Sequence, residues 1–270
     1  MKLLLGSELA DYIKERQLRQ ARNLRQEHGA KPTLAIVQTS DNPVIGTYVR
    51  MKQQYGEDIE IEVRRHEVQS EDLLSTIEAL NNDVSVHGII VQLPLADESQ
   101  TQEAVDLVAP EKDVDGLGAR AQLTPATAMA IDWLLAGFNV DLKGKKIGIV
   151  GNGRLVGGPL AKLWKATGYD VTVFDEHSKN MAKQLRRCNV IVSAAGVPGL
   201  ITSMFVQPGA VVVDAATSSE HGKILGDVAD EVRDRNDLTI TPDKGGVGPL
   251  TVAALFDNVL RATRKQVVGD

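Results

Sequence analysis

Short apolar segments recur along this chain, each flanked by stretches with helical spacing, and this alternation limits the folds that the chain can adopt. Residues 34–38 and 88–93 have the composition of buried strands, and residues 59–63 alternate apolar with acidic side chains. Apolar residues at helical spacing predict helices over 44–55 and 70–80, between the successive strands. Strands and helices in this order predict a βαβαβ unit with a parallel sheet.

A second series of the same kind follows the first. Its predicted strands cover 147–150, 170–174, 190–193, 211–214 and 238–241, with a helix over 156–167. Further helices are predicted over 7–28, 126–136 and 249–265. The 270 residues correspond to one to two domains at roughly 150 residues per domain. We therefore expect the α/β class, with two α/β lobes joined near residues 120–145.

Composition and charge exclude several classes of function. The single cysteine, Cys188, excludes a disulfide framework and a cysteine-based zinc site, and the five histidines show no metal-ligand spacing, so no metal is expected. A net charge of −6 with 4% aromatic residues disfavours nucleic acid as a partner. No apolar run approaches the ~20 residues that span a bilayer, and Leu3–Leu5 is too short for a signal peptide. We expect a cytoplasmic protein.

A glycine-rich turn lies between the strand at 147–150 and the helix after it. It contains Gly151, Asn152, Gly153, Arg154, Val156 and Gly157. A turn of this kind lets backbone N–H groups and the helix N-terminus receive a pyrophosphate, which predicts a Rossmann-type dinucleotide-binding lobe. The spacing is GxGxxxG rather than GxGxxG, and a turn without a ligand is the alternative.

Two further segments of this lobe support a dinucleotide. Asp175 ends the next strand, about 24 residues after Gly151, where an acidic residue binds the ribose 2′-hydroxyl of NAD and repels the 2′-phosphate of NADP. A helix cap is the alternative for this aspartate. The segment after the strand at 190–193 allows the backbone to approach a nucleotide closely, through Ala195, Gly196 and Pro198.

The first lobe has three weaker signals. Tyr48 and Lys52 are four residues apart on a predicted helix and share one face, and a lysine near apolar surface can act as an acid or base. Gln92 ends a buried strand, where open α/β sheets bind ligands. Asp115 lies in an Asp-Val-Asp-Gly loop, for which a simple turn is the alternative interpretation. For Lys52 the alternative is a solvated lysine without a catalytic role.

Four motifs occur together and in order, and they resemble one family. They are Tyr48-Val49-Arg50-Met51-Lys52, Gly88-Ile89-Ile90-Val91-Gln92-Leu93-Pro94-Leu95, Pro110-Glu111-Lys112-Asp113-Val114-Asp115-Gly116 and Thr241-Pro242-Asp243-Lys244-Gly245-Gly246-Val247-Gly248-Pro249-Leu250-Thr251. From about residue 1 to 265 the chain is similar to the bifunctional methylenetetrahydrofolate dehydrogenase/methenyltetrahydrofolate cyclohydrolase family.

The resemblance implies a role for each matching residue. Lys52 would be the acid/base of the cyclohydrolase step, Tyr48 would stack on the folate ring system, and Gln92 would hydrogen-bond Lys52. Asp115 would bind the pterin, so that these four residues form the expected catalytic set. The remaining substrate-binding residues would be Leu93, Pro94, Gly245, Gly246 and Pro249, with Val247 in the same loop at the nicotinamide end.

It also implies the activity and the organisation of the chain. The enzyme would oxidise 5,10-methylenetetrahydrofolate with NAD or NADP and hydrolyse the methenyl product to 10-formyltetrahydrofolate, in one-carbon metabolism. The folate-binding domain would comprise residues 1–123 and 250–270, because the last helix returns to the first lobe, and the dinucleotide-binding domain residues 124–249. The family forms homodimers through the cofactor lobe.

Three departures from the family pattern matter. The family's Gly-Arg-Ser, which helps to hold the NADP 2′-phosphate, is Gly151-Asn152-Gly153, and its later His-Ser aligns with Asp175-Glu176, so NAD is favoured. Pro125-Ala126-Thr127-Ala128 replaces Pro-Cys-Thr-Pro after a shortened loop, and Pro242-Asp243-Lys244 replaces Pro-Val-Pro. Three alternatives stay open: a monofunctional NAD-dependent dehydrogenase with weak cyclohydrolase activity, a non-catalytic folate- or dinucleotide-binding protein, and an unrelated Rossmann dehydrogenase.

Overall fold

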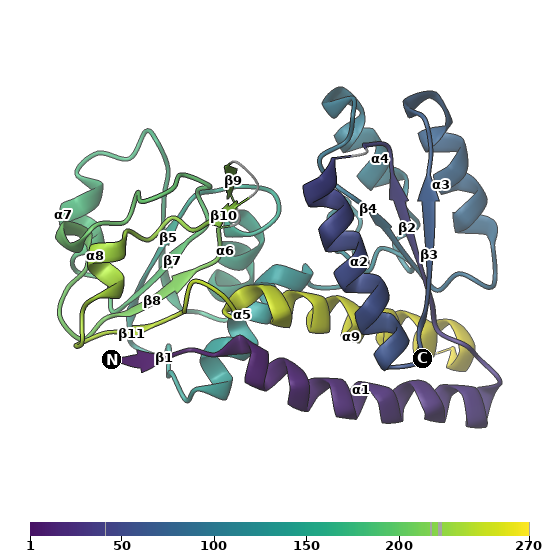
Figure 1. Ribbon diagram of the computed structural model, residues 1–270, viewed down its shortest axis with the longest axis horizontal. Coiled ribbons are helices and arrows are strands. Elements are labelled where there is room, and N and C mark those ends of the chain that lie inside the picture. The colour runs from purple at the N-terminus through teal and green to yellow at the C-terminus, as the bar shows by residue number, and fades with distance from the viewer. Residues whose placement is uncertain (41, 217, 221–222, 270) are drawn as a thin grey trace. The chain divides into compact units, whose positions relative to one another are not determined.

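The computed structural model describes residues 1–40, 42–216, 218–220 and 223–269, and the chain divides into two compact units. The six-stranded unit comprises Met1–Ala10 and Thr127–Thr251, and the three-stranded unit comprises Asp11–Ala126 and Val252–Asp270. The predicted α/β class is confirmed, because helices alternate with strands and both larger sheets are parallel (Figure 1).

The three-stranded unit has the predicted βαβαβ arrangement. Its elements are most of α1 (Gly6–His28), β2 (Thr33–Gln38), α2 (Pro43–Asp58), β3 (Glu62–Glu67), η1 (Ser70–Asp72), α3 (Leu73–Asn82), β4 (Gly88–Val91), η2 (Glu98–Gln100), α4 (Thr101–Leu107) and most of α9 (Val247–Val268). The strand order is β3-β2-β4. Every residue of the central strand β2 is buried, and α3 and α4 pack on β2 and β4 through a shared apolar cluster (Figure 1).

The strand predicted at 59–63 is displaced toward the C-terminus. The structure begins β3 at Glu62, because Glu60 has a φ of 59° and makes the turn that ends α2. Ile59 and Ile61 are buried on either side of this turn, so the apolar alternation there reflects a packed connection. The pattern of burial was readable from the sequence, but the left-handed turn inside it was not.

The six-stranded unit contains the second series of elements. These are β1 (Lys2–Leu3), α5 (Ala126–Gly137), β5 (Lys146–Val150), α6 (Gly157–Ala166), β6 (Asp170–Phe174), α7 (Met181–Leu185), β7 (Val190–Ser193), η3 (Ser203–Phe205), β8 (Val211–Asp214), β9 (Ser218–Glu220), β10 (Lys223–Leu225), α8 (Asp230–Arg233) and β11 (Thr239–Ile240). The sheet order is β1-β11-β8-β7-β5-β6, and β9 and β10 form a separate antiparallel pair. From β5 the chain runs outward to β6 and then returns to the other side of β5 with β7, so the order reverses between β5 and β7.

Near each end of the chain, one helix has residues in both units: α1 at the N-terminal end and α9 at the C-terminal end. Lys2 and Leu3 pair in parallel with Thr239 and Ile240, so the first ten residues belong to the six-stranded unit, whereas the sequence placed residues 1–123 together. A two-residue strand has no periodicity of its own and is defined by its partner. Within the three-stranded unit, α1 and α9 lie side by side: the Gln17 side chain donates to the Ala253 carbonyl oxygen at 2.7 Å (Figure 1).

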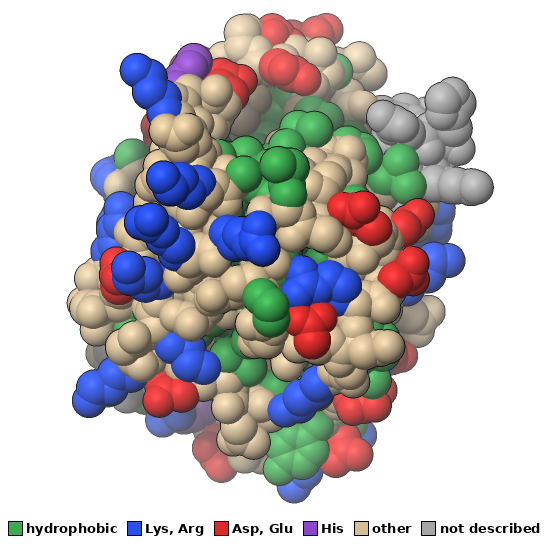
Figure 2. Space-filling model, turned by 90° about the vertical axis from the view of Figure 1, so that its left-hand side faces the viewer, with side chains coloured by type: hydrophobic (Ala, Val, Ile, Leu, Met, Phe, Trp, Pro, Cys, Tyr) green, Lys and Arg blue, Asp and Glu red, His purple; other side chains and the backbone are tan. Residues whose placement is uncertain are grey.

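The face of the six-stranded unit that carries α7 and α8 has a mixed charge. Figure 2 shows lysine and arginine side chains gathered along one side of this face and acidic side chains mainly along the other, with apolar and neutral surface between them. Neither sign of charge covers the face.

Candidate active site and dinucleotide-binding loops

Lys52 and Gln92 are brought together by the topology of the three-stranded unit. Lys52 lies on α2, which follows β2, and Gln92 directly follows β4, the strand beside β2. The Lys52 Nζ atom donates a hydrogen bond to Gln92 Oε1 at 2.7 Å, and Gln92 Nε2 donates to the Leu93 carbonyl oxygen at 3.0 Å. The second bond fixes which end of the Gln92 amide faces Lys52, so the ammonium meets an oxygen.

The Asp115 loop is held by a buried carboxylate next to it in sequence. Asp113 is 4% exposed and accepts hydrogen bonds from the N–H groups of Gly116 at 2.8 Å and Gly118 at 2.9 Å. The sequence offered a simple turn as the alternative for this motif, and Asp113 does hold a turn. Asp115, two residues later, lies near enough to Lys52 for each charge to shift the pKa of the other group.

Burial and charge act in opposite directions on Lys52 and Asp115. Desolvation lowers the pKa of Lys52, and the negative charge of Asp115 partly raises it again. Burial raises the pKa of Asp115, and the Lys52 ammonium partly offsets that rise. A desolvated lysine with a lowered pKa loses its proton more readily than a solvated one, which suits it to accept and return a proton.

The remaining expected substrate residues of this unit lie close in sequence to Lys52 or to Gln92. Tyr48 lies one turn before Lys52 on α2, and its side chain is partly buried. Leu93 and Pro94 continue the chain from Gln92 through a cis peptide bond. The structure therefore places the four expected catalytic residues in one unit, on three segments. Tyr48 and Lys52 lie on α2, which follows β2; Gln92 follows β4; and Asp115 lies in the loop just before Gly116.

Two residues that sequence reasoning did not assign hold the Asp115 loop in place. Asn258 of α9 is fully buried, and its Nδ2 atom donates to the carbonyl oxygens of Val114 and Thr124, each at 2.9 Å. The Lys112 ammonium donates to the carbonyl oxygens of Leu80 and Asp83 at the end of α3. A polar residue within the apolar spacing of 252–262 was the available signal for Asn258.

The turn after β5 has the close packing that a dinucleotide-binding loop needs. Gly151 has a φ of 95°, and a Cβ atom there would lie 2.4 Å from the Ala194 carbonyl oxygen. A Cβ atom on Gly157, the first residue of α6, would lie 1.9 Å from the Gly151 carbonyl oxygen. Gly153 has open space around its Cβ position, so the loop leaves room above the helix N-terminus. These residues fit a pyrophosphate at the start of α6.

The other expected cofactor residues lie around the same end of the sheet. Ala195, Gly196 and Pro198 follow β7, at the point where the strand order reverses. Asp175 directly follows β6; its Oδ1 atom accepts from the His177 N–H at 3.0 Å and from the Ser178 hydroxyl at 2.9 Å. The carboxylate therefore holds a local turn with one oxygen. It does not cap a helix, the alternative that the sequence offered, because α7 begins at Met181 and its N-cap residue is Asn180.

Gly245, Gly246 and Pro249 belong to the six-stranded unit, where they connect β11 to the first turn of α9. The Ser7 N–H donates to the Gly245 carbonyl oxygen at 3.0 Å, so this loop packs on the start of α1. Asp243, one of the unexplained departures from the family pattern, forms an ion pair with Arg233 at 2.6 Å.

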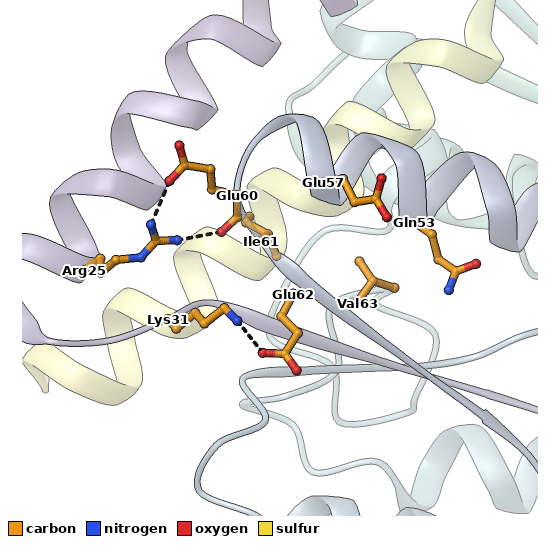
Figure 3. A pocket seen from close by; sticks show the side chains of 8 residues that line it. All are labelled: Arg25, Lys31, Gln53, Glu57, Glu60, Ile61, Glu62 and Val63. Atoms are coloured by element: carbon orange, nitrogen blue, oxygen red, sulfur yellow. Dashed lines mark hydrogen bonds and ion pairs between the residues drawn. The ribbon is translucent and has the colours of Figure 1, made fainter.

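A separate surface hollow lies in the three-stranded unit near the start of β3 (Figure 3). It is lined by Arg25, Lys31, Gln53, Glu57, Glu60, Ile61, Glu62 and Val63. Its cations are already paired, Arg25 with Glu60 and Lys31 with Glu62 (Figure 3). Among the described residues there is no group of three metal-ligating side chains placed to hold an ion, and no helix is long and apolar enough to cross a membrane.

Comparison with known families accounts for both units. Residues 4–115 match the tetrahydrofolate dehydrogenase/cyclohydrolase catalytic domain, and residues 125–267 match the tetrahydrofolate dehydrogenase/cyclohydrolase NAD(P)-binding domain.

Individual relatives match over nearly the whole chain. Bifunctional protein FolD of Hydrogenobaculum sp. (strain Y04AAS1) is 35% identical, over 99% of this chain and 100% of its own length. The crystal structure of FolD from Campylobacter jejuni has a TM-score of 0.92 and 33% identity, covering 98% of this chain and 99% of that one. FolD of Trypanosoma brucei, solved with NADP and an inhibitor, has a TM-score of 0.91 and 30% identity over 98% of both chains. The chain therefore belongs to the tetrahydrofolate dehydrogenase/cyclohydrolase family.

Proposed function

We propose that this protein oxidises 5,10-methylenetetrahydrofolate with a nicotinamide dinucleotide and then hydrolyses the 5,10-methenyl product to 10-formyltetrahydrofolate. The observation that carries the proposal is the hydrogen bond between Lys52 and Gln92, with Asp115 as the countercharge. It supplies a desolvated, oriented acid/base in the unit that matches the family's catalytic domain. Both activities are named for the family whose two domains the chain matches.

For the oxidation, the dinucleotide supplies a hydride acceptor when it is bound, and the protein's part is to bind and align. The turn at Gly151–Gly157 and the start of α6 would hold the pyrophosphate, and the segment Ala195–Pro198 would lie against the nucleotide. Asp115 would hold the pterin, with Tyr48 stacked on the folate ring system. No side chain needs to gain or lose a proton in this step.

For the hydrolysis, Lys52 performs the proton transfers. Water adds to the electrophilic methenyl carbon and loses a proton, which the neutral Lys52 amine accepts. The same group then returns that proton to N5 as the bond between N5 and the carbon breaks. The hydroxyl group loses its proton to solvent as it becomes the formyl carbonyl, so the formyl group remains on N10 and one proton is released overall. Gln92 Oε1 keeps Nζ in place during both transfers, because the bond between them is short and its acceptor end is fixed.

We propose NAD rather than NADP as the preferred dinucleotide. Asn152 and Gly153 replace the Arg and Ser that help to hold the 2′-phosphate in the family, and Asp175 adds a carboxylate at the end of β6. Only Oδ1 of this carboxylate is used by the local turn of His177 and Ser178, which leaves Oδ2 to accept from a ribose hydroxyl. The same charge would repel a 2′-phosphate.

One coupled assay tests these proposals. The protein is given 5,10-methylenetetrahydrofolate with NAD or NADP, and reduced cofactor and methenyl absorbance are followed together. We expect reduced NAD to form with little accumulation of the methenyl compound, because hydrolysis follows. Persistent methenyl accumulation would support a monofunctional dehydrogenase instead, and a higher kcat/KM with NADP would overturn the NAD assignment. From the family resemblance we also propose a homodimer, which light scattering would test by measuring the mass in solution. The cytoplasmic location expected from the sequence stays a proposal.

A further inference from the structure

A buried carboxylate without a role in the mechanism lies behind one of the dinucleotide-binding loops. Asp227 follows β10 and is fully buried. Its Oδ2 atom accepts from the Ser193 hydroxyl at 2.7 Å and from the N–H groups of Ala195 at 2.7 Å and Gly196 at 3.3 Å. Its Oδ1 atom accepts from the Val197 N–H at 2.7 Å. Three consecutive N–H groups of one loop thus converge on one side chain.

The backbone of Asp227 is in turn hydrogen-bonded to a second aspartate, Asp214. The Asp227 N–H donates to Asp214 Oδ1 at 3.1 Å, and Asp214, at the end of β8, also receives Arg233 Nη2 at 2.6 Å. The backbone of Asp227 is therefore anchored at the end of β8, while its carboxylate binds the loop after β7. Consecutive N–H groups that converge on an anion stabilise its charge and in turn fix their own orientation.

The loop that Asp227 holds forms one wall of the proposed dinucleotide site. Its first residue, Ala194, lies so close to Gly151 that a Cβ atom on that glycine would come within 2.4 Å of the Ala194 carbonyl oxygen. Ala195, Gly196 and Pro198 are the cofactor residues expected from the sequence. A change in the path of residues 194–198 would therefore alter the space beside the glycine-rich turn.

We propose that Asp227 is a positioning residue for dinucleotide binding: its carboxylate fixes residues 194–197 in the conformation that receives the cofactor. This inference rests on the proposed function, because it assumes that these loops bind a dinucleotide. It assigns Asp227 no contact with substrate or cofactor. The candidate acid/base, Lys52, belongs to the other unit, so the hydrolysis activity can report separately on the integrity of the protein.

The test compares three variants with the wild-type protein. Asp227→Asn keeps the shape of the side chain but places an amide donor against one or more loop N–H groups, and Ser193→Ala removes one hydrogen bond of the cluster. Asp230→Asn makes the same chemical change at an exposed aspartate at the start of α8 and is the matched control. The readouts are the calorimetric Kd of NAD and of NADP, hydrogen exchange of amides 195–197 in the dinucleotide-free protein, and the rate of methenyltetrahydrofolate hydrolysis.

For Asp227→Asn we expect a rise of roughly tenfold or more in the dinucleotide Kd and in the exchange rate of amides 195–197, because a hydrogen bond to a charged group is lost. Hydrolysis and the Asp230→Asn control should stay at the wild-type level. Unchanged Kd and unchanged exchange would overturn the proposal. If Asp227→Asn does not fold, Ser193→Ala decides: a smaller rise in both quantities supports the proposal and none overturns it. A wild-type protein that binds neither dinucleotide would instead refute the proposed function.

Discussion

Two effects act in opposite directions on the pKa of the Lys52 ammonium group: desolvation and the charge of a nearby carboxylate. Removal from water lowers its pKa, Asp115 partly restores it, and Gln92 fixes its position. The combination suits this lysine to the acid/base role that we propose for it, although the residue type is usually a solvated cation. Sequence spacing placed Tyr48 and Lys52 on one helix face. The hydrogen bond from Lys52 to Gln92, forty residues away in sequence, was implied only by the family resemblance, and the fold forms it.

Replacement of the amine tests its role directly. Lys52→Met keeps a long unbranched side chain and removes the proton acceptor, so we expect loss of methenyltetrahydrofolate hydrolysis by a factor of about 100 or more. Dinucleotide binding should persist. Methenyl absorbance decay measures the first quantity and calorimetry the second, with Lys31→Met at an exposed ion pair as the control. Full retention of hydrolysis would contradict the assignment.

The pH dependence tests the coupling between the two charges. Asp115 raises the pKa of Lys52, so its neutralisation in Asp115→Asn leaves desolvation unopposed, and the pKa falls further. We therefore expect the limb of the pH profile of kcat for hydrolysis that reports Lys52 deprotonation to move to lower pH. The profile is measured at saturating substrate, because Asp115 is also proposed to bind the pterin. A limb that stays in place or moves upward would show that Asp115 does not act on Lys52.

Among the elements, the turn between β5 and α6 illustrates how a sequence pattern becomes a site. Gly157 is required by the fold, because a Cβ atom would lie 1.9 Å from the Gly151 carbonyl oxygen, whereas Gly153 meets no such restriction. The sequence marked both glycines equally. The structure distinguishes them: Gly157 is needed for packing, whereas Gly153 is needed only to leave space free for a ligand.

The two glycines should therefore respond differently to alanine. Gly153→Ala should leave the thermal midpoint unchanged and raise the dinucleotide Kd about tenfold, because its Cβ atom would occupy the space offered to the pyrophosphate. Gly157→Ala should lower the midpoint as well, since the turn itself must shift. Calorimetry and thermal unfolding provide the comparison. Normal dinucleotide binding by Gly153→Ala would place the pyrophosphate elsewhere.

The last helix contributes a further element-scale effect. Asn258 donates to two loop carbonyl groups on either side of the shortened segment after Gly116, and its removal would take this donor from the buried Val114 carbonyl and the partly buried Thr124 carbonyl. We expect Asn258→Ala to lower the free energy of unfolding by about 1–3 kcal/mol and to weaken folate binding through the Asp115 loop. Urea unfolding measures the first, with the exposed Arg264→Ala as the control. An unchanged unfolding midpoint would show that the loop holds itself.

Across the whole molecule, the chain uses two parallel sheets, and α1 and α9 each contribute residues to both units. Each sheet reverses its strand order between two neighbouring strands, β5 and β7 in one unit and β2 and β4 in the other. Candidate residues follow all four of these strands: the Gly151 turn follows β5, Ala195 follows β7, α2 with Lys52 follows β2, and Gln92 follows β4. The net charge of −6 gave no indication of a binding partner. Among the acidic residues, Asp175 is the one that we propose to favour NAD over NADP.

Cofactor preference should be visible in the stability of the intact protein. A ligand that binds only the folded state stabilises it by about 2.7 kcal/mol at a hundredfold excess over its Kd. At equal concentrations we expect NAD to raise the thermal midpoint more than NADP does, and Asp175→Asn to narrow that difference. Differential scanning calorimetry of the wild-type protein and of Asp175→Asn, each with NAD and with NADP, measures these shifts in the thermal midpoint. A larger shift with NADP in the wild-type protein would reverse the proposed preference.

The sequence by itself determined the α/β class, the two series of strands and helices and the family, because apolar periodicity and motif order are local properties of the chain. Tertiary structure decided which distant residues meet. It paired Lys2–Leu3 with β11, moved the third predicted strand to Glu62–Glu67, and set Asp227 behind the loop after β7. These outcomes depend on strand order and on the partners of buried polar groups, and no periodicity records either.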